Sequence, residues 1–217
     1  MSSLALMRWL EGTPERYDAG MRALTFGQVG HLHAAVAEAA APEPGARVLE
    51  IGCGTGTVTA LLRERGARVT ALDQAPEMLE IARKRLGSDA GVEWREQTAA
   101  EIDALPEAAY DAVVLSLCLS DMSRSERAFV LREAVQRLSP GGRLVVGDEV
   151  IARGALQRGL QRVWRLPQAS LAWLVVGSVS RPIGDLTGEL QAAGVEVGAE
   201  QHWLLGSLAL VVGERAG

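Results

Sequence analysis

A glycine-rich segment at residues 48–56 constrains the fold of this chain more than any other feature. It reads V-L-E-I-G-C-G-T-G, so a short apolar run leads into three closely spaced glycines. The run is typical of a buried strand, and the glycines predict a tight loop before a helix that begins near Thr57. Glycine allows the backbone to approach a ligand closely and to adopt positive φ. A second strand over residues 68–72 leads to Asp73, which completes a strand–loop–helix–strand unit with a ligand at the loop.

The spacing of acids and glycines distinguishes between nucleotide ligands. Dinucleotide sites use G-x-G-x-x-G, whereas here the third position of that pattern is Thr57. Glu50 lies two residues before the first glycine, where it would repel a pyrophosphate, and no P-loop sequence is present. The helix N-terminus favours a ligand carboxylate, while Glu50 and Asp73 suit an ammonium group and a ribose. The unit therefore indicates S-adenosylmethionine.

Strands and helices alternate through the middle of the chain. Strands are expected at 46–51, 68–72, 91–95, 110–117 and 143–149, and helices at 28–41, 57–65, 76–86 and 124–138. This order predicts an α/β fold with a mostly parallel sheet and helices on both faces. Ligands of such sheets bind at the carboxyl ends of the strands. The segments expected together at that edge are 52–56, 73–75, 97–99 and 116–121.

The chain of 217 residues is interpreted as one domain with a sizeable core. Its expected parts are an N-terminal helical cap at 1–44, a cofactor-binding core at 45–150, an insertion or lid at 151–183, and a closing helix and hairpin at 184–217. The closing part is expected to hold a helix at 184–193 and antiparallel strands at 195–203 and 207–214. The sequence S-P-G-G at 139–142 predicts a turn that ends the preceding helix.

Composition excludes several function classes. The net charge is −5 and no basic face is evident, so no nucleic-acid partner is expected. Cys53 and Cys118 are the only cysteines, which excludes a disulfide framework and a zinc site; buried thiols are expected, with redox sensing or metal capture as the alternative. No metal site is predicted. The chain shows no signal peptide and no transmembrane stretch, which predicts a cytoplasmic protein.

Three segments resemble landmarks of the class I S-adenosylmethionine-dependent methyltransferases: residues 48–56, 71–85 and 138–146. The resemblance implies a Rossmann-like seven-stranded sheet with an antiparallel C-terminal hairpin, and methyl transfer that leaves S-adenosylhomocysteine as product. The R-Y-D opening at 16–18 and the flanking segments at 180–182 and 206–208 resemble those of quinone-biosynthesis C-methyltransferases. They also resemble those of a methyltransferase group that lies beside corrinoid proteins.

The resemblance also implies roles for individual residues. Glu50 would hold the methionine ammonium group, Asp73 the ribose hydroxyls, and Gln74 would lie beside the adenine. Thr98 and Ala99 stand where many relatives have Asp-Ala, so the adenine contact would fall to the Thr98 hydroxyl or the Ala99 backbone. The full expected cofactor set is Tyr17, Glu50, Gly52, Cys53, Gly54, Gly56, Asp73, Gln74, Met78, Thr98, Ala99 and Ser116. For Tyr17, simple packing of the cap is the alternative.

Methyl transfer mainly requires donor and acceptor to be aligned in a dry pocket, and a base is needed only if the acceptor loses a proton. His33 and Asp121 are the candidate catalytic residues. A solvated or packing histidine is the alternative for His33, and a cap for the helix near Ser123 is the alternative for Asp121. Asp148 and Glu149 are expected either to face the acceptor or, with slight preference, to be solvated loop acids.

The insertion at 153–180 alternates arginine with leucine and tryptophan. Such a pattern is typical of a core-facing helix, of a lid over an apolar acceptor, or of an interfacial helix in peripheral contact with a membrane. The predicted function is methyl transfer to a small-molecule, lipid-like or corrinoid-linked acceptor. The alternative is a non-catalytic S-adenosylmethionine-binding partner or sensor for a corrinoid protein. A nicotinamide-dependent oxidoreductase is disfavoured by Glu50 and Thr57.

Overall fold

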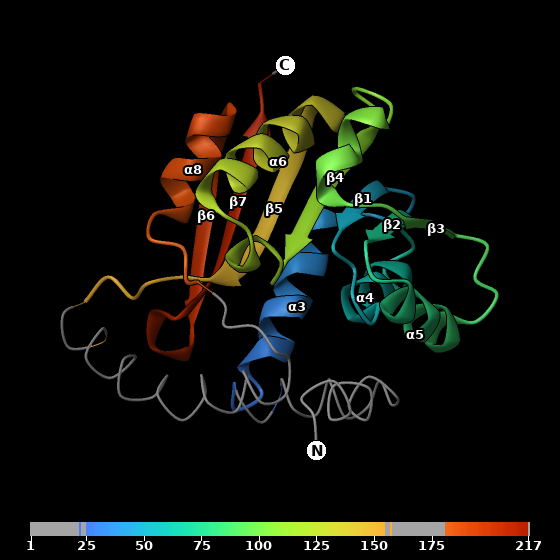
Figure 1. Ribbon diagram of the computed structural model, residues 1–217, viewed down its shortest axis with the longest axis horizontal. Helices are drawn as coiled ribbons and strands as arrows, with labels where there is room; N and C mark the ends of the chain where they lie inside the picture. Colours follow the sequence, from blue (N-terminus) through green and yellow to red (C-terminus); the bar gives the residue numbers. More distant parts are fainter. Residues whose placement is uncertain (1–21, 23–24, 155–156, 158–180, 217) are drawn as a thin grey trace.

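The computed structural model describes residue 22, residues 25–154, residue 157 and residues 181–216 (Figure 1). Tyr17 and nearly all of the 153–180 insertion lie outside these residues, so the predictions made for them stay predictions. Among the described residues, no helix combines the length and hydropathy that crossing a bilayer requires.

The described elements alternate as the sequence predicts. The helices are α3 (Gln28–Ala40), α4 (Thr57–Glu64), α5 (Pro76–Leu86), α6 (Arg124–Arg137) and α8 (Leu186–Ala193), with short 3-10 turns η1 (Ala99–Ala104), η2 (Leu119–Asp121) and η3 (Leu204–Gly206). The strands are β1 (Arg47–Ile51), β2 (Arg68–Asp73), β3 (Val92–Glu96), β4 (Tyr110–Ser116), β5 (Leu138–Glu149), β6 (Val195–Trp203) and β7 (Leu208–Arg215). The observed ranges agree with the expected ones because the spacing of apolar residues changes clearly between strands and helices.

These strands form one seven-stranded sheet in the order β3-β2-β1-β4-β5-β7-β6. The pairs among β1 to β5 are parallel, whereas β7 runs antiparallel to both β5 and β6. The predicted fold class is therefore confirmed. The order reverses between β1 and β4, and a ligand crevice is expected where strands diverge in this way.

Helices cover both faces of the sheet. One face packs Leu49, Val113 and Leu144 into a core shared with α6 and α8. The opposite face packs Val48, Val114 and Val145 against α3 and α4. Figure 1 shows α6 and α8 over the β4–β7 half of the sheet and α4 and α5 beside β1–β3. Because successive strand residues point to opposite faces, nearly continuous apolar strands are required for this two-sided burial.

The S-P-G-G segment is the main departure from the expected elements. The helix α6 ends at Arg137, as predicted, but the chain is already in β5 from Leu138. Leu138 pairs with Tyr110, the register then shifts, and regular pairing resumes at Ala112 with Arg143. The segment at 139–142 is thus an irregularity within a long strand, and the prediction of a separate turn was wrong. A β-bulge absorbs extra residues in this way without ending the strand.

Candidate functional site

A cavity of about 1440 Å³ lies at the carboxyl ends of the parallel strands. Its wall includes residues from all four segments that were expected to meet at this edge: Gly52–Thr55 after β1, Asp73–Ala75 after β2, Gln97–Ala99 after β3, and Ser116–Cys118 with Asp121 after β4. The prediction of a shared edge is confirmed. The cavity is large enough for a nucleoside-sized ligand together with a second molecule.

The glycine loop between β1 and α4 needs glycine for two physical reasons. Gly52, Gly54 and Gly56 have φ values of +72°, +53° and +74°, a region that side chains disfavour. A Cβ atom on Gly52 would lie 2.9 Å from the Cβ of Cys118, and one on Gly56 would lie 2.9 Å from the Cβ of Ala82. The loop is therefore packed closely between the β4 end and α5.

Asp73 links this loop to the end of β2. One carboxylate oxygen accepts a hydrogen bond from the Gly54 amide at 2.8 Å, and the other accepts from the Ala75 amide at 2.9 Å. Each carboxylate oxygen has a second lone pair, so Asp73 can also accept from the hydroxyls of a ribose. The carboxylate thus shapes the loop and offers acceptors to a ligand from the same position.

Glu50 is buried in the cavity wall with 2% of its surface exposed. The Thr59 hydroxyl donates to its carboxylate at 2.6 Å. Burial raises the pKa of Glu50 to about 8, and this hydrogen bond only partly opposes the effect. A cation beside the carboxylate would stabilise its ionised form. The site therefore holds a buried acid that an ammonium group would complement.

The wall at the end of β3 is less open to hydrogen bonding than expected. Thr98 caps η1, and the Glu101 carboxylate accepts both its amide, at 3.0 Å, and its hydroxyl, at 2.9 Å. The hydroxyl hydrogen is thereby used, and the Thr98 oxygen, which also accepts the Glu101 amide in this capping box, keeps one lone pair to act as an acceptor. An adenine amino group donates hydrogen bonds, so an acceptor is what that group requires. Gln74, Ala75, Met78, Ala99 and Ala100 also line this part of the cavity.

The opposite part of the cavity combines apolar walls with titratable side chains, among them the two candidate catalytic residues. Val29 and His33 come from α3, and Met122 and Phe129 come from the segment around the start of α6. Asp121 lies among them; part of its surface stays exposed, but partial desolvation and the nearby charge of Glu149 raise the pKa of its carboxyl. Both candidate catalytic residues, His33 and Asp121, thus face the same cavity.

The N-cap of α6 is a residue other than Asp121. Ser123 is the N-cap of α6, and its side chain accepts the Glu126 amide at 3.3 Å while the Glu126 carboxylate accepts the Ser123 amide at 2.7 Å. Asp121 therefore does not cap this helix. Of the other histidines, His31 is exposed on α3, and His202 is 2.7 Å from the Glu200 carboxylate.

Three small polar side chains complete the wall between the glycine loop and β4. Cys53 and Cys118 are free thiols, and burial raises the pKa of each, which favours unreactive protonated thiols. The hydroxyl oxygen of Ser116 is buried in the cavity wall and finds no hydrogen-bond partner among the described residues. A buried polar atom without a partner is costly, so Ser116 is suited to contact a ligand. No cluster of three metal-ligating side chains exists among the described residues.

The structure corrects one further expectation. Asp148 is not a solvated loop acid, because none of its surface is exposed. Its carboxylate accepts the backbone amides of Leu119 and Ser120. The apolar residues of the cavity wall, such as Phe129 and Val29, were not singled out from the sequence, because helical periodicity predicts burial without showing whether a core or a cavity lies beside a residue.

These residues fit S-adenosylmethionine at the strand ends. The glycine loop leaves room for a close backbone approach, Glu50 offers a buried acid to the ammonium group, and Asp73 offers acceptors to the ribose. Ser116 adds a buried hydroxyl that lacks a partner in the described part of the chain. A dinucleotide would instead place a pyrophosphate beside Glu50. The donor set is therefore chemically matched to a ligand that carries a positive charge and a ribose.

Comparisons with known proteins agree with this chemistry. Residues 48–142 match the model of a family described as a methyltransferase domain. The chain is 32% identical over 165 residues to a ubiquinone biosynthesis O-methyltransferase of Xanthomonas campestris, covering 68% of this chain and 67% of the relative. It is 35% identical over 132 residues to a demethylmenaquinone methyltransferase of Tropheryma whipplei, covering 61% of this chain and 54% of the relative. The chain thus spans about half the length of this second relative.

The fold agrees with a solved structure as well. An S-adenosylmethionine-dependent methyltransferase from Mesorhizobium loti superposes with a TM-score of 0.65 at 23% identity, covering 83% of this chain and 96% of that one. The fold, the glycine loop with Glu50 and Asp73, and the sequence relatives all indicate the same family. The chain belongs to the class I S-adenosylmethionine-dependent methyltransferases.

Proposed function

We propose that this chain transfers the methyl group of S-adenosylmethionine to a small aromatic acceptor of the quinone type. The observation that carries the proposal is the division of one cavity into two chemically different parts. The polar part holds the glycine loop, Glu50 and Asp73, and the apolar part holds Met122 and Phe129 beside Asp121. A ring with a hydroxyl group matches apolar walls that have the Asp121 carboxylate at their edge.

The residues of the polar part would bind and orient the donor, which when bound supplies an activated methyl group and leaves as a neutral thioether. Glu50 would hold the ammonium group, Asp73 the ribose and Thr98 the adenine amino group. The glycine loop would carry the donor across the end of β1. Met78, Gln74 and Ala99 would line the adenine end, and Ser116 and Cys53 would lie near the methionine end.

The residues of the apolar part would orient the acceptor and take its proton. Asp121 is the preferred base, because burial and Glu149 raise the pKa of its carboxyl and so increase its affinity for a proton. His33 lies in the wall of the same cavity and is the second candidate. Apolar walls exclude water from the reacting atoms, and alignment within such a pocket supplies much of the rate.

The four regions proposed from the sequence would act as one domain. Residues 45–150 would form the donor site, and residues 184–217 would close the sheet. A cytoplasmic location, a lipid-like acceptor and peripheral membrane contact through 153–180 stay predictions. So do a corrinoid-linked acceptor and a non-catalytic role beside a corrinoid protein.

The test is a turnover assay with a defined set of acceptors. S-adenosylhomocysteine formation would be measured with a short-chain demethylmenaquinol, a prenylated catechol, their oxidised quinones and reduced cobalamin. Methylation of a reduced quinone or catechol is expected, and Asp121→Asn should lower kcat by about 10²–10⁴ if Asp121 is the base. His33→Gln is the matched variant for the second candidate.

Each other outcome selects a different function. Turnover with cobalamin alone would replace the quinone acceptor with a corrinoid. Tight binding of S-adenosylhomocysteine without any turnover would favour the non-catalytic role. Absence of binding, together with binding of NADH, would refute the methyltransferase proposal.

A further inference from the structure

The turn after β4 supplies the acceptor side of the cavity. Within it, Leu117, Cys118 and Asp121 reach the cavity wall, while Leu119 and Ser120 point into the protein and are buried. Leu117 has a left-handed backbone, with φ of +54°, which is unusual for a residue with a branched side chain. A turn in this conformation requires contacts from the rest of the fold to hold it.

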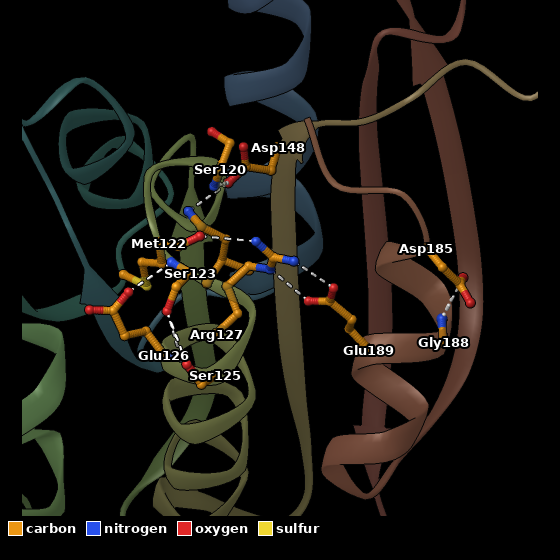
Figure 2. A network of polar contacts seen from close by, with 11 residues as sticks. Ser120, Met122, Ser123, Ser125, Glu126, Arg127, Asp148, Asp185, Gly188 and Glu189 are labelled. Atoms are coloured by element: carbon orange, nitrogen blue, oxygen red, sulfur yellow. Dashed lines mark hydrogen bonds and ion pairs between the residues drawn. The ribbon is translucent and has the colours of Figure 1, made fainter. Parts of the chain in front are cut away.

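Asp148 provides the first of these contacts from the end of β5. One carboxylate oxygen accepts the amide of Leu119 at 2.8 Å and the amide of Ser120 at 3.3 Å, and the other accepts the amide of Glu149 at 2.7 Å. Figure 2 shows the Asp148 carboxylate beside Ser120. Two buried amides of the turn thus depend on one side chain, and buried amides without partners are costly.

A second contact holds the other end of the turn. The Arg127 guanidinium donates to the carbonyl of Met122 at 3.0 Å, and it forms a two-pronged ion pair with the Glu189 carboxylate on α8, with both distances 2.8 Å. The side chains of Arg127 and Glu189 are only 10% and 18% exposed. Figure 2 shows this pair bridging α6 and α8 behind the turn. The turn is therefore fixed at both ends by buried charged groups.

The same turn packs against the donor loop. The Cys118 thiol lies 3.5 Å from the carbonyl of Ile51, and the Cβ of Cys118 leaves no room for a side chain on Gly52. On its far side, the carbonyl of Ser120 accepts the amide of Arg181 at 2.9 Å. A shift of the turn would consequently change the distance between the donor loop and the acceptor wall.

We infer that Asp148 is a positioning residue for methyl transfer, which holds the turn of Leu119–Asp121 so that Asp121 and the acceptor wall are aligned with the donor loop. This inference rests on the proposed function for its catalytic consequence. Asp148 is not among the described residues that line the cavity, and it acts through the backbone amides of the turn that it accepts. Small errors in alignment lower the rates of such reactions strongly.

The surroundings of Asp148 determine the pH at which its carboxyl is protonated, and this protonation can be measured. Burial raises the pKa of this carboxyl to about 6, while hydrogen bonds from the Ser120 side chain and from the amides of Glu149 and Leu119 favour the charged form, and the charge of Glu149 opposes it. Arg127 on α6 is the nearby positive group, and the Cys118 thiol and Asp121 belong to the turn itself. Protonation of Asp148 below about pH 6 should weaken the hydrogen bonds to the two amides of the turn.

The first experiment requires no acceptor. In amide NMR spectra of the full chain, the signals of Leu119 and Ser120 should titrate together with a midpoint near pH 6. Asp148→Asn should abolish that titration, because an amide side chain does not ionise in this range. If the two signals do not titrate in the wild type, or titrate unchanged in Asp148→Asn, the inference is overturned.

The second experiment separates positioning from general stability. Asp148→Ala should lower kcat/KM for a reduced quinone by about ten- to hundredfold, with the Kd for S-adenosylhomocysteine changed less than about threefold, and Asp148→Asn should restore part of the loss. The matched control is Asp185→Ala, since Asp185 also accepts a backbone amide, that of Gly188 at 2.9 Å, but caps α8 away from the turn.

The possible outcomes are distinct. Equal losses in Asp148→Ala and Asp185→Ala, or equal losses of donor and acceptor binding, would show a merely structural role and overturn the inference. If Asp148→Ala does not fold, the Asn variant and the NMR titration still decide. If the wild type turns over no quinone or catechol, the proposed function fails while the NMR result for Asp148 stands independently.

Discussion

Glu50 allows a sharp test of how the donor site is built, through the variant Glu50→Gln. In the folded, empty protein its pKa is raised from 4.5 to about 8, chiefly by burial. The folded state therefore binds a proton more tightly than the unfolded state, so stability falls as the pH rises from about 4.5 to about 8. Each pH unit in that window corresponds to about 1.36 kcal/mol, which gives a total of about 5 kcal/mol.

Glutamine does not ionise, so the variant should lack this loss. Urea unfolding of the protein at pH 5 to 9 should show Glu50→Gln gaining stability relative to the wild type, by about 4 kcal/mol between the two ends of the range, since about three pH units of the window lie inside it. Thr59→Val is the matched control. It removes the hydrogen bond that favours ionised Glu50, and should move the wild-type window to higher pH.

Folding favours the protonated form of Glu50, whereas ligand binding should favour its ionised form. An ammonium group requires the ionised carboxylate, so binding of S-adenosylhomocysteine at pH 7 should release about one proton per site from the wild type and none from Glu50→Gln. Calorimetry in two buffers of different ionisation enthalpy measures this proton. A stability difference that stays flat from pH 5 to 9, with no proton released, would refute the reasoning about Glu50.

Two further substitutions test the donor loop. Asp73→Ala should weaken binding of S-adenosylhomocysteine at least about tenfold by calorimetry, because hydrogen bonds to charged groups contribute about 1.5–3 kcal/mol; unchanged affinity would remove Asp73 from the site. Gly56→Ala should lower the free energy of unfolding by about 2–4 kcal/mol in urea, because it combines left-handed strain with a clash at Ala82. Gly54→Ala, where no atom of the described part of the chain beyond the neighbouring residues lies within 4 Å of the added Cβ, should cost only about 1–2 kcal/mol, and equal losses would contradict the clash.

The donor half of the site could be predicted from the sequence because it depends on local order. A strand, a glycine loop and a helix follow one another at 47–64, and parallel pairing brings Glu50 and Asp73 to the same edge once the sheet forms. Periodicity also predicted the strands and helices, since burial on both faces demands nearly continuous apolar strands. The separate turn predicted for the S-P-G-G segment was wrong, because its turn-forming residues are equally suited to a bulge.

The acceptor half was decided by tertiary structure. The sequence identified Asp121 and His33, which are far apart in the chain, but only the packing of α3 against the sheet, including β4 and β5, brings both to the wall of one cavity. The prediction that Asp148 is solvated was wrong, because the sequence does not show that an acid at a strand end accepts hydrogen bonds from buried amides.

The sequence by itself thus determined the fold and the methyl donor, whose recognition groups lie within two consecutive strand–loop units. The tertiary structure decided which acids are buried and which residues face the acceptor. The physical reason is that burial and the resulting pKa shifts depend on contacts between segments distant in the chain, such as Asp148 with Leu119 and Arg127 with Glu189.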